Sequence, residues 1–312
     1  MDRQVIGAEA AEAAAEGGGA GVPPRPGAPA PWTARLPPRV PGGRAGAAVA
    51  LGVLGAMALA ALLAPVLAGH DPVATDTSAT ALPPGSPGHP LGTDQLGRDL
   101  LARMLYGARY SLAVGVAASA ATVLLGTAVG ALAAVAPRWL DTAVARTADA
   151  LLALPMILVA LTLAAVAGPS PATVVAAITV TGWMPVALIA RAEVKALRGR
   201  PFVRAARSLG LTRTRIFLRH LVPNALPPIA AVAAFEVGHA VLTESTLSFL
   251  GVGIPPNTPS WGNMLTDARA LLLTGQWYTV ALPSAAIVLL IVAVNAVATG
   301  LERRGAGEGR TW

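Results

Sequence analysis

Long apolar runs separated by shorter polar segments dominate the chain. Each run is long enough to cross roughly 30 Å of hydrocarbon as a helix. Backbone groups at an open strand edge would stay unsatisfied in lipid, so every run is expected to be helical. The pattern predicts an all-α integral membrane protein with six transmembrane helices. The runs cover residues 45–68, 111–136, 142–167, 172–190, 225–243 and 279–300.

Composition agrees with a membrane location. Hydrophobic residues make up 54% of the 312 and charged residues only 12%, whereas soluble domains carry about 25% charged residues. Cysteine is absent, which excludes disulfides and thiolate metal sites. Residues 1–44 are rich in Ala, Gly and Pro and predict a disordered tail. The first apolar run begins too late and continues too long for a signal peptide.

Basic residues are distributed unevenly between the two sides of the predicted bundle. The tail, the 137–146 turn, the 191–223 loop and the C-terminal tail 301–312 together hold 19 Lys and Arg, and the opposite connections hold 4. Cytoplasmic loops carry the excess of basic residues in membrane proteins. Both termini and the 191–223 loop are therefore expected to be cytoplasmic, and residues 69–110 extracytoplasmic.

One strongly charged, amphipathic segment lies between the fourth and fifth runs, and it reads PFVRAARSLGLTRTRIFLRHLVP over residues 201–223. Gly210 divides it, where a left-handed helix end is expected, and Thr212 can cap a second short helix. The spacing places four apolar residues on one face of the first helix: Phe202, Ala205, Ala206 and Leu209. Two short helices joined by a glycine are expected, either as a docking element or as a basic helix lying on the membrane surface.

Part of this segment, AARSLGLTRTRIFLRHLVPN, resembles the EAA loop of the permease subunits of bacterial ABC importers. The resemblance implies a coupling helix that sits in a cleft of the cytoplasmic ATPase subunit. Arg204 stands where the family usually has Glu, and a matching change in the partner is expected. The residues at motif positions are Ala205, Ala206, Gly210, Ile216, Leu221 and Pro223.

Two further segments resemble the dipeptide/oligopeptide/nickel branch of the same family. Residues 89–115 read HPLGTDQLGRDLLARMLYGARYSLAVG, and residues 243–265 read TESTLSFLGVGIPPNTPSWGNML. In the first, His89, Asp94 and Asp99 suggest either turn and helix-cap positions or a cation site, and the turn reading is favoured. The second is an apolar loop rich in Gly and Pro, expected to be a re-entrant plug or a lid.

The resemblance implies the type I ABC importer permease fold, with a five-helix core at 111–300, in the bacterial inner membrane. It also implies four kinds of partner: a homologous second permease, two cytoplasmic ATPase subunits, an extracytoplasmic solute-binding protein and the lipid bilayer. The implied cargo is a di- or oligopeptide or a related small solute, with nickel as an option in this branch.

The sequence itself provides no site for ATP. No GxxxxGK[ST] loop is present, and the single lysine, Lys195, lies between Val and Ala. Neither a catalytic residue, a cofactor site nor a metal site is expected, so ATP should be bound by partner subunits. Basic residues lack the aromatic interleaving of a single-strand nucleic-acid binder.

Ionisable residues inside the fifth run are candidates for the translocation pathway. Glu236 and His239 lie one helical turn apart, and such groups usually face a bundle interior or a wet cavity. They could line the pathway or form a structural pair, and both readings stay open. Glu244, just beyond the run, is a third candidate.

A self-contained secondary transporter or channel is the alternative function, but it predicts an inverted repeat that the chain does not show. A membrane-anchored scaffold would leave the Gly/Pro-rich outer loop unexplained.

Overall fold

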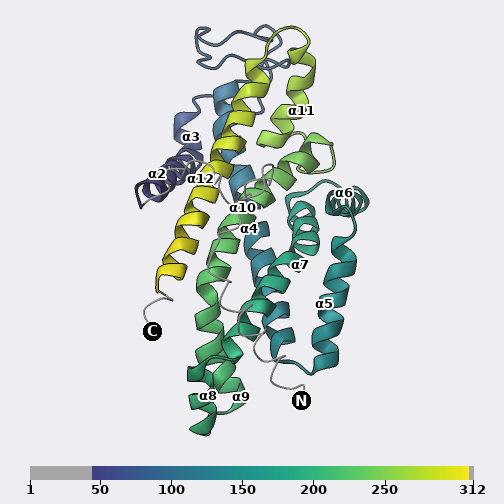
Figure 1. Ribbon diagram of the computed structural model, residues 1–312. Helices are drawn as coiled ribbons and strands as arrows, with labels where there is room; N and C mark the ends of the chain where they lie inside the picture. The colour runs from purple at the N-terminus through teal and green to yellow at the C-terminus, as the bar shows by residue number, and fades with distance from the viewer. Residues whose placement is uncertain (1–43, 309–312) are drawn as a thin grey trace, which may run out of the picture. The chain divides into compact units, whose positions relative to one another are not determined.

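The computed structural model describes residues 44–308, and the regular structure of this part is helical (Figure 1). The predicted disordered tail and the last four residues lie outside the described range, apart from Arg44. The helices are α2 (Arg44–Leu62), α3 (Ala64–Leu67), α4 (Leu100–Val135), α5 (Arg138–Leu152), α6 (Met156–Ala167), α7 (Pro171–Arg198), α8 (Pro201–Ser208), α9 (Arg213–Ile216), the π-helical turn η2 (Phe217–Leu221), α10 (Val222–Phe249), α11 (Trp261–Leu272) and α12 (Tyr278–Glu308).

Five helical stretches are long and apolar enough to cross a membrane, and a sixth results if α5 and α6 count as one broken span. The five continuous stretches are Ala45–Leu62, Leu100–Val135, Pro171–Arg198, Arg213–Phe249 and Tyr278–Leu301. These helices differ in how much of them is buried. In the most apolar 18-residue stretch, 11% of the residues are buried in α2 and 44% in α7. Helix α7 is therefore the more central, and α2 leaves most of its apolar surface for lipid or a partner.

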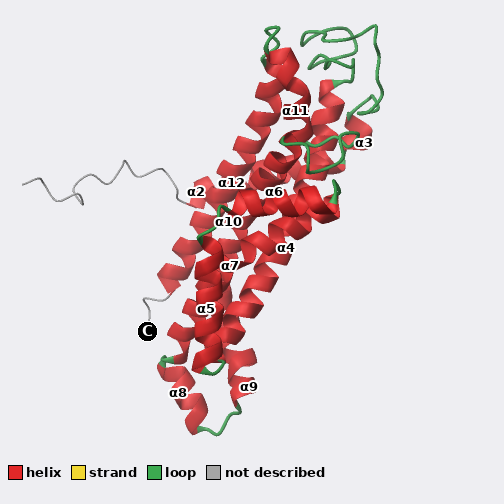
Figure 2. Ribbon diagram, turned by 90° about the vertical axis from the view of Figure 1, so that its right-hand side faces the viewer, coloured by secondary structure: helices red, strands yellow, loops and turns green. Residues whose placement is uncertain are grey.

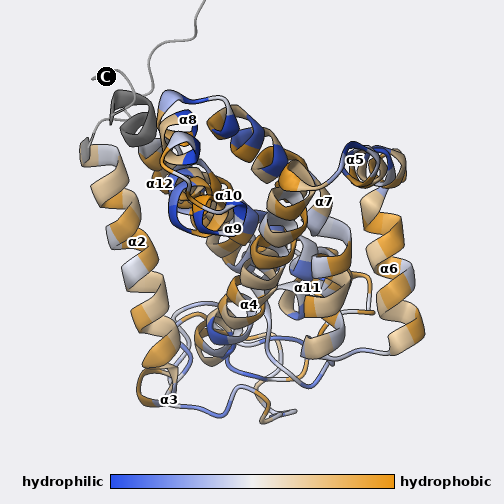
Figure 3. Cartoon of the chain, turned by 90° about the horizontal axis from the view of Figure 1, so that it is seen from below, coloured by the Kyte–Doolittle hydropathy of each residue, from blue (hydrophilic) through white to orange (hydrophobic). Residues whose placement is uncertain are grey.

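The predicted third span, residues 142–167, is not one continuous helix. The chain bends by 86° between α5 and α6, because Pro155 lacks a backbone N–H and disfavours helical geometry in the residue before it. The two halves also differ in surface chemistry. Helix α5 is amphipathic and α6 is apolar throughout, as the hydropathy colouring shows (Figure 3).

Two other predicted boundaries shift. Helix α4 begins at Leu100, eleven residues before the predicted second span, because the apolar residues that follow Asp99 continue the same helix. Helix α10 continues to Phe249, so the first seven residues of the predicted 243–265 loop are helical. The irregular part of that segment is residues 250–260, between α10 and α11.

Helices α4 and α7 are in close backbone contact along their length. A Cβ on Gly126 would lie 2.6 Å from the carbonyl oxygen of Trp183, and a Cβ on Gly130 would overlap the backbone of Ala187. Real Cβ atoms do not approach so closely. The GxxxG spacing in α4 therefore serves the close helix contact that such motifs permit.

We expect Gly130→Ala to destabilise the protein by about 1–3 kcal/mol, because the added methyl group forces α4 and α7 apart. The measurement is the thermal unfolding midpoint of the purified chain in detergent. Gly52→Ala is the control, since a Cβ on Gly52 in α2 meets nothing within 4 Å. Equal midpoints for the two variants would contradict the close-contact role.

Candidate functional site

The two short helices predicted around Gly210 are present and lie side by side at one end of the helices (Figure 2). Gly210 has φ +77°, the left-handed conformation expected of it. Thr212 caps α9, because its hydroxyl accepts a hydrogen bond from the Arg215 N–H at 3.3 Å. A Cβ on Gly210 would meet nothing within 4 Å. Backbone conformation alone therefore requires glycine here.

The apolar residues of α8 are divided between the core and the surface. Val203 and Ala206 are the buried residues of this helix, since they face a core formed with α4, α7 and α9. Three of the four residues predicted to share one apolar face are exposed: Phe202, Ala205 and Leu209. Leu209 is 79% exposed and Phe202 39%. These three residues form an apolar stripe, hereafter the exposed stripe of α8.

The motif residues divide into two groups. Ala206, Ile216 and Leu221 meet in one buried core, so they fix the position of α8 and α9. Arg204 and Ala205 are exposed, and Pro223 lies in the first turn of α10, where a missing N–H is tolerated. The exposed group is the one available to a partner.

Ion pairs that the sequence did not point to hold the start of this loop. Asp141 of α5 accepts hydrogen bonds from Arg191 Nε at 2.5 Å, from Arg191 Nη2 at 3.0 Å and from Lys195 Nζ at 2.5 Å. The Arg198 guanidinium donates to the carbonyl oxygen of Ala134 at the end of α4. The last turns of α7 are thus tied to both α4 and α5, which fixes the point from which α8 departs.

Glu236 and His239 lie together, as their spacing predicts. The Glu236 Oε2 atom is 3.7 Å from His239 Nδ1, and both residues line a cavity of about 310 Å³ between the α5–α6 bend, α7 and α10. The His239 side chain is 60% exposed and that of Glu236 14%. The buried Glu236 Oε2 has no hydrogen-bond partner among the described residues. An acceptor of this kind is free to receive a donor from a molecule in the cavity.

Glu244 lies in a different environment. It is fully buried and accepts hydrogen bonds from Ser248 Oγ at 2.9 Å and from Ser111 Oγ of α4 at 3.1 Å. Ser111 Oγ in turn accepts from the backbone N–H of Trp261, the first residue of α11, at 3.2 Å. This cluster joins α4, α10 and α11, and Glu244 does not line the cavity of Glu236 and His239.

Hydrogen bonds with α10 and α11 hold the 250–260 loop in place. Asn263 of α11 donates from Nδ2 to the carbonyl oxygens of Ile254, Pro255 and Thr258 at 3.2, 3.0 and 2.9 Å. The backbone N–H of Ile254 donates to Ser248 Oγ at 3.1 Å. These hydrogen bonds join residues nine positions apart or fewer, so the loop folds back on its own flanking helices.

The aspartates that precede α4 hold turns and caps, as the favoured reading predicts. Asp99 caps α4 by accepting from the Ala102 N–H at 2.7 Å. Asp94 accepts from Arg98 Nε at 2.6 Å and from Arg103. Both arginines also donate to Asp267 of α11, at 2.7 and 2.8 Å. This buried network ties α11 to the start of α4 and leaves Asp94 engaged by cations of the chain itself.

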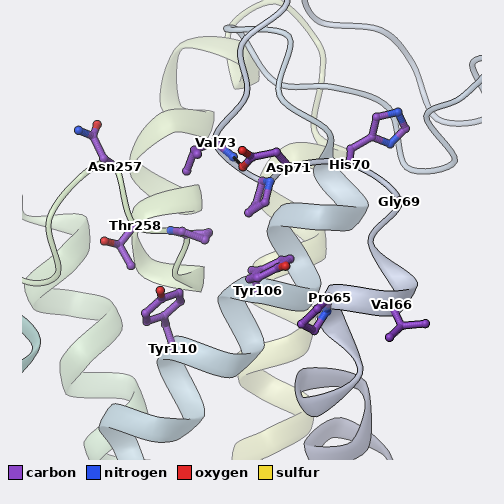
Figure 4. A pocket seen from close by; sticks show the side chains of 12 residues that line it. Pro65, Val66, Gly69, His70, Asp71, Val73, Tyr106, Tyr110, Asn257 and Thr258 are labelled. Carbon is purple, nitrogen blue, oxygen red and sulfur yellow. Dashed lines mark hydrogen bonds between the residues drawn. The ribbon is translucent and has the colours of Figure 1, made fainter.

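A second cavity, of about 540 Å³, opens at this end (Figure 4). Tyr106 and Tyr110 of α4 form its floor, residues 69–73 lie along one side, and Asn257 and Thr258 of the 250–260 loop lie along the other. It is separate from the Glu236 cavity, because the two share no lining residue.

Comparisons with known proteins agree with the resemblance seen in the sequence. The family described as "Binding-protein-dependent transport system inner membrane component" matches residues 126–305. A putative peptide transport system permease protein of Brucella suis biovar 1 is 39% identical over 78% of this chain and 81% of its own length. The dipeptide transport system permease protein DppC of Alkalihalophilus pseudofirmus is 35% identical over 82% of this chain and 84% of its own length. The probable D,D-dipeptide transport system permease protein DdpC of Escherichia coli is 34% identical over 79% and 82%.

Proposed function

We propose that this chain, which belongs to the family of binding-protein-dependent transport system inner membrane components, forms the translocation path of an ATP-driven importer for di- or oligopeptides. The chain is a multi-pass inner-membrane permease subunit, and ATP hydrolysis takes place in partner subunits. Peptides are favoured as cargo because relatives at 34–39% identity are named as peptide or dipeptide permeases. The family assignment favours this function over a self-contained secondary transporter, which needs no ATPase partner.

The observation that carries the coupling role is the geometry of α8 and α9. Their inner residues are locked into the core, the turn between them is fixed by Gly210, and the exposed stripe of α8 remains without a covering element among residues 44–308. This surface also exposes Arg204, Arg207 and Arg213. A partner with an apolar groove and an acidic rim would complement it, and an ATPase subunit is the partner that the family supplies.

The assembly that we propose contains a homologous second permease, two cytoplasmic ATPase subunits and an extracytoplasmic solute-binding protein. The orientation places both termini and α8–α9 in the cytoplasm, with the 69–99 segment and α11 outside. The 19-to-4 distribution of Lys and Arg supports it. The ion pairs of Asp141 with Arg191 and Lys195 of α7 would then lie at the cytoplasmic end. There they would hold α8 and α9 in position.

Gly210→Val should weaken binding of the ATPase subunits on the order of tenfold, because a β-branched residue in the left-handed conformation costs about 1–2 kcal/mol. The change should leave membrane insertion intact and reduce ATP hydrolysis and peptide uptake together. Pull-down and uptake are measured after reconstitution with the cognate ATPases. Gly199→Val is the matched control: Gly199 has φ −83° and lies one helix earlier. Normal docking and uptake by Gly210→Val would overturn the coupling role.

For the pathway we propose that Glu236 and His239 contact the cargo, whereas Glu244 holds the helices beneath the 250–260 loop. The lack of a hydrogen bond to Glu236 Oε2 and the 310 Å³ cavity beside it support the first role. A carboxylate oxygen there can accept a hydrogen bond from the ammonium group or an amide N–H of a peptide. The full burial of Glu244 and its hydrogen bonds from Ser111, Ser245 and Ser248 support the second role.

Glu236→Gln should reduce peptide uptake several-fold and leave the thermal midpoint nearly unchanged, since Oε2 makes no hydrogen bond and its 3.7 Å ion pair with His239 joins residues of one helix. Glu244→Gln, the matched variant, should instead lower the midpoint, because an amide N–H₂ replaces an acceptor in the serine cluster, at about 1–3 kcal/mol for a buried group left unsatisfied. Uptake and thermal unfolding are measured on both variants. A Glu236→Gln protein that loses stability but transports at the normal rate per folded molecule would contradict the pathway role.

A further inference from the structure

Three metal-ligating side chains from separate segments meet near the start of α4. His70 follows α3, His89 lies in the connecting segment, and Asp99 caps α4. Each offers one ligand atom, and these atoms all lie within 4.8 Å of one another. The imidazole rings of His70 and His89 are stacked, with centroids 5.0 Å apart and an interplanar angle of 29°. Ligand atoms that share a zinc ion lie about 3–3.5 Å apart, given bonds of about 2.0–2.1 Å, so a small side-chain movement would close the site.

Two of the three ligands are already fixed. Asp99 is 3% exposed, and its Oδ2 atom is held by the N–H of Ala102 at 2.7 Å. Its Oδ1 atom lies 2.9 Å from His89 Nδ1. Two atoms that ligate one ion lie at nearly this separation, so Asp99 Oδ1 and His89 Nδ1 can bind the ion together. The His89 side chain is only 17% exposed, so its ring is held by the surrounding segment.

The third ligand is free to adjust. His70 is exposed, and it follows Gly69, whose φ of +68° turns the chain out of α3. Figure 4 shows its ring at the rim of the 540 Å³ cavity, turned away from Tyr106. An exposed side chain on such a turn can rotate toward the fixed pair at little cost. The alternative to a metal site is an ordinary ion pair between His89 and Asp99. That ion pair does not need His70, whereas the metal site does.

The donor set determines the class of ion. Two imidazole nitrogens and one carboxylate oxygen suit zinc and its neighbours, whereas magnesium and calcium prefer all-oxygen sites. Asp94 does not belong to the set, since Arg98 and Arg103 donate to its Oδ2 and the backbone N–H groups of Leu96 and Arg98 donate to its Oδ1.

We propose that His70, His89 and Asp99 form a binding site for a divalent transition-metal ion of the zinc class. The ion links the turn after α3 to the first residue before α4 and so clasps the 69–99 segment onto the helices. This site lies on the face that the proposed orientation places outside the cytoplasm. It is separate from the Glu236 cavity, and its occupancy is measurable without any transport.

The test is zinc binding by the full-length chain, purified in detergent with a tag that contains no histidine and stripped of metal by a chelator. Zinc chloride is titrated at pH 7.5 in competition with a chromophoric zinc indicator. The variants are His70→Ala, His89→Ala and, as the matched control, His220→Ala in η2, at the other end of the helices. We expect one equivalent of zinc for the unaltered chain and for His220→Ala, with affinity at least tenfold weaker in His70→Ala and His89→Ala.

His70→Ala is the decisive variant, because an exposed side chain can be removed without unfolding the protein. Its thermal midpoint in the presence of chelator should equal that of the unaltered chain. Zinc affinity unchanged by His70→Ala would overturn the site, as would an unaltered chain that takes up no stoichiometric zinc at micromolar concentration. An equal loss of binding in His220→Ala would overturn it as well.

Discussion

The contact between α4 and α7 is the constraint on which the described structure depends. At Gly126 and Gly130 the two backbones approach so closely that no side chain fits between them. Lipid tails are as apolar as leucine, so burial alone gives helices little reason to associate in a membrane, and close packing of small residues supplies it.

Each end of this helix pair positions a different polar element. Where α7 ends, the Asp141 ion pairs and the Arg198 contact to α4 set the departure of α8. Where α4 begins, its capping aspartate and the arginine network set the 69–99 segment and α11. A change in the α4–α7 contact would therefore reach the polar elements at both ends of this helix pair.

Much of the fold could be predicted from the sequence because membrane spans are encoded by uninterrupted apolar runs. The break at Pro155 was missed because the run continues through it, and apolar composition does not distinguish a straight span from a bent one. The face of α8 was assigned from the spacing of Phe202 and Leu209. That spacing does not say which residues are buried; tertiary contacts decide it, since Val203 and Ala206 reach the core and the larger residues remain outside.

The site was predictable to the extent that its residues are neighbours in the sequence. Gly210, Thr212 and the Glu236–His239 pair depend on local spacing, and the structure places them as expected. The Glu244 cluster and the Asp141 ion pairs join residues 50 to 150 positions apart, and no single-sequence pattern indicates such partners. The sequence showed only that Glu244 is a carboxylate beside an apolar run, without indicating its partners.

The most direct test of the central claim uses the absence of cysteine from the chain. A single cysteine is placed at Leu209, in the exposed stripe of α8, and the assembled transporter is treated with a short thiol-to-amine crosslinker. A second chain carries its cysteine at Trp139, which is 72% exposed on α5, as a measure of nonspecific capture. If α8 couples this subunit to ATP hydrolysis, Leu209→Cys crosslinks to an ATPase subunit far more efficiently than Trp139→Cys and inhibits uptake. Equal crosslinking of the two chains, or none at Leu209, would contradict the account.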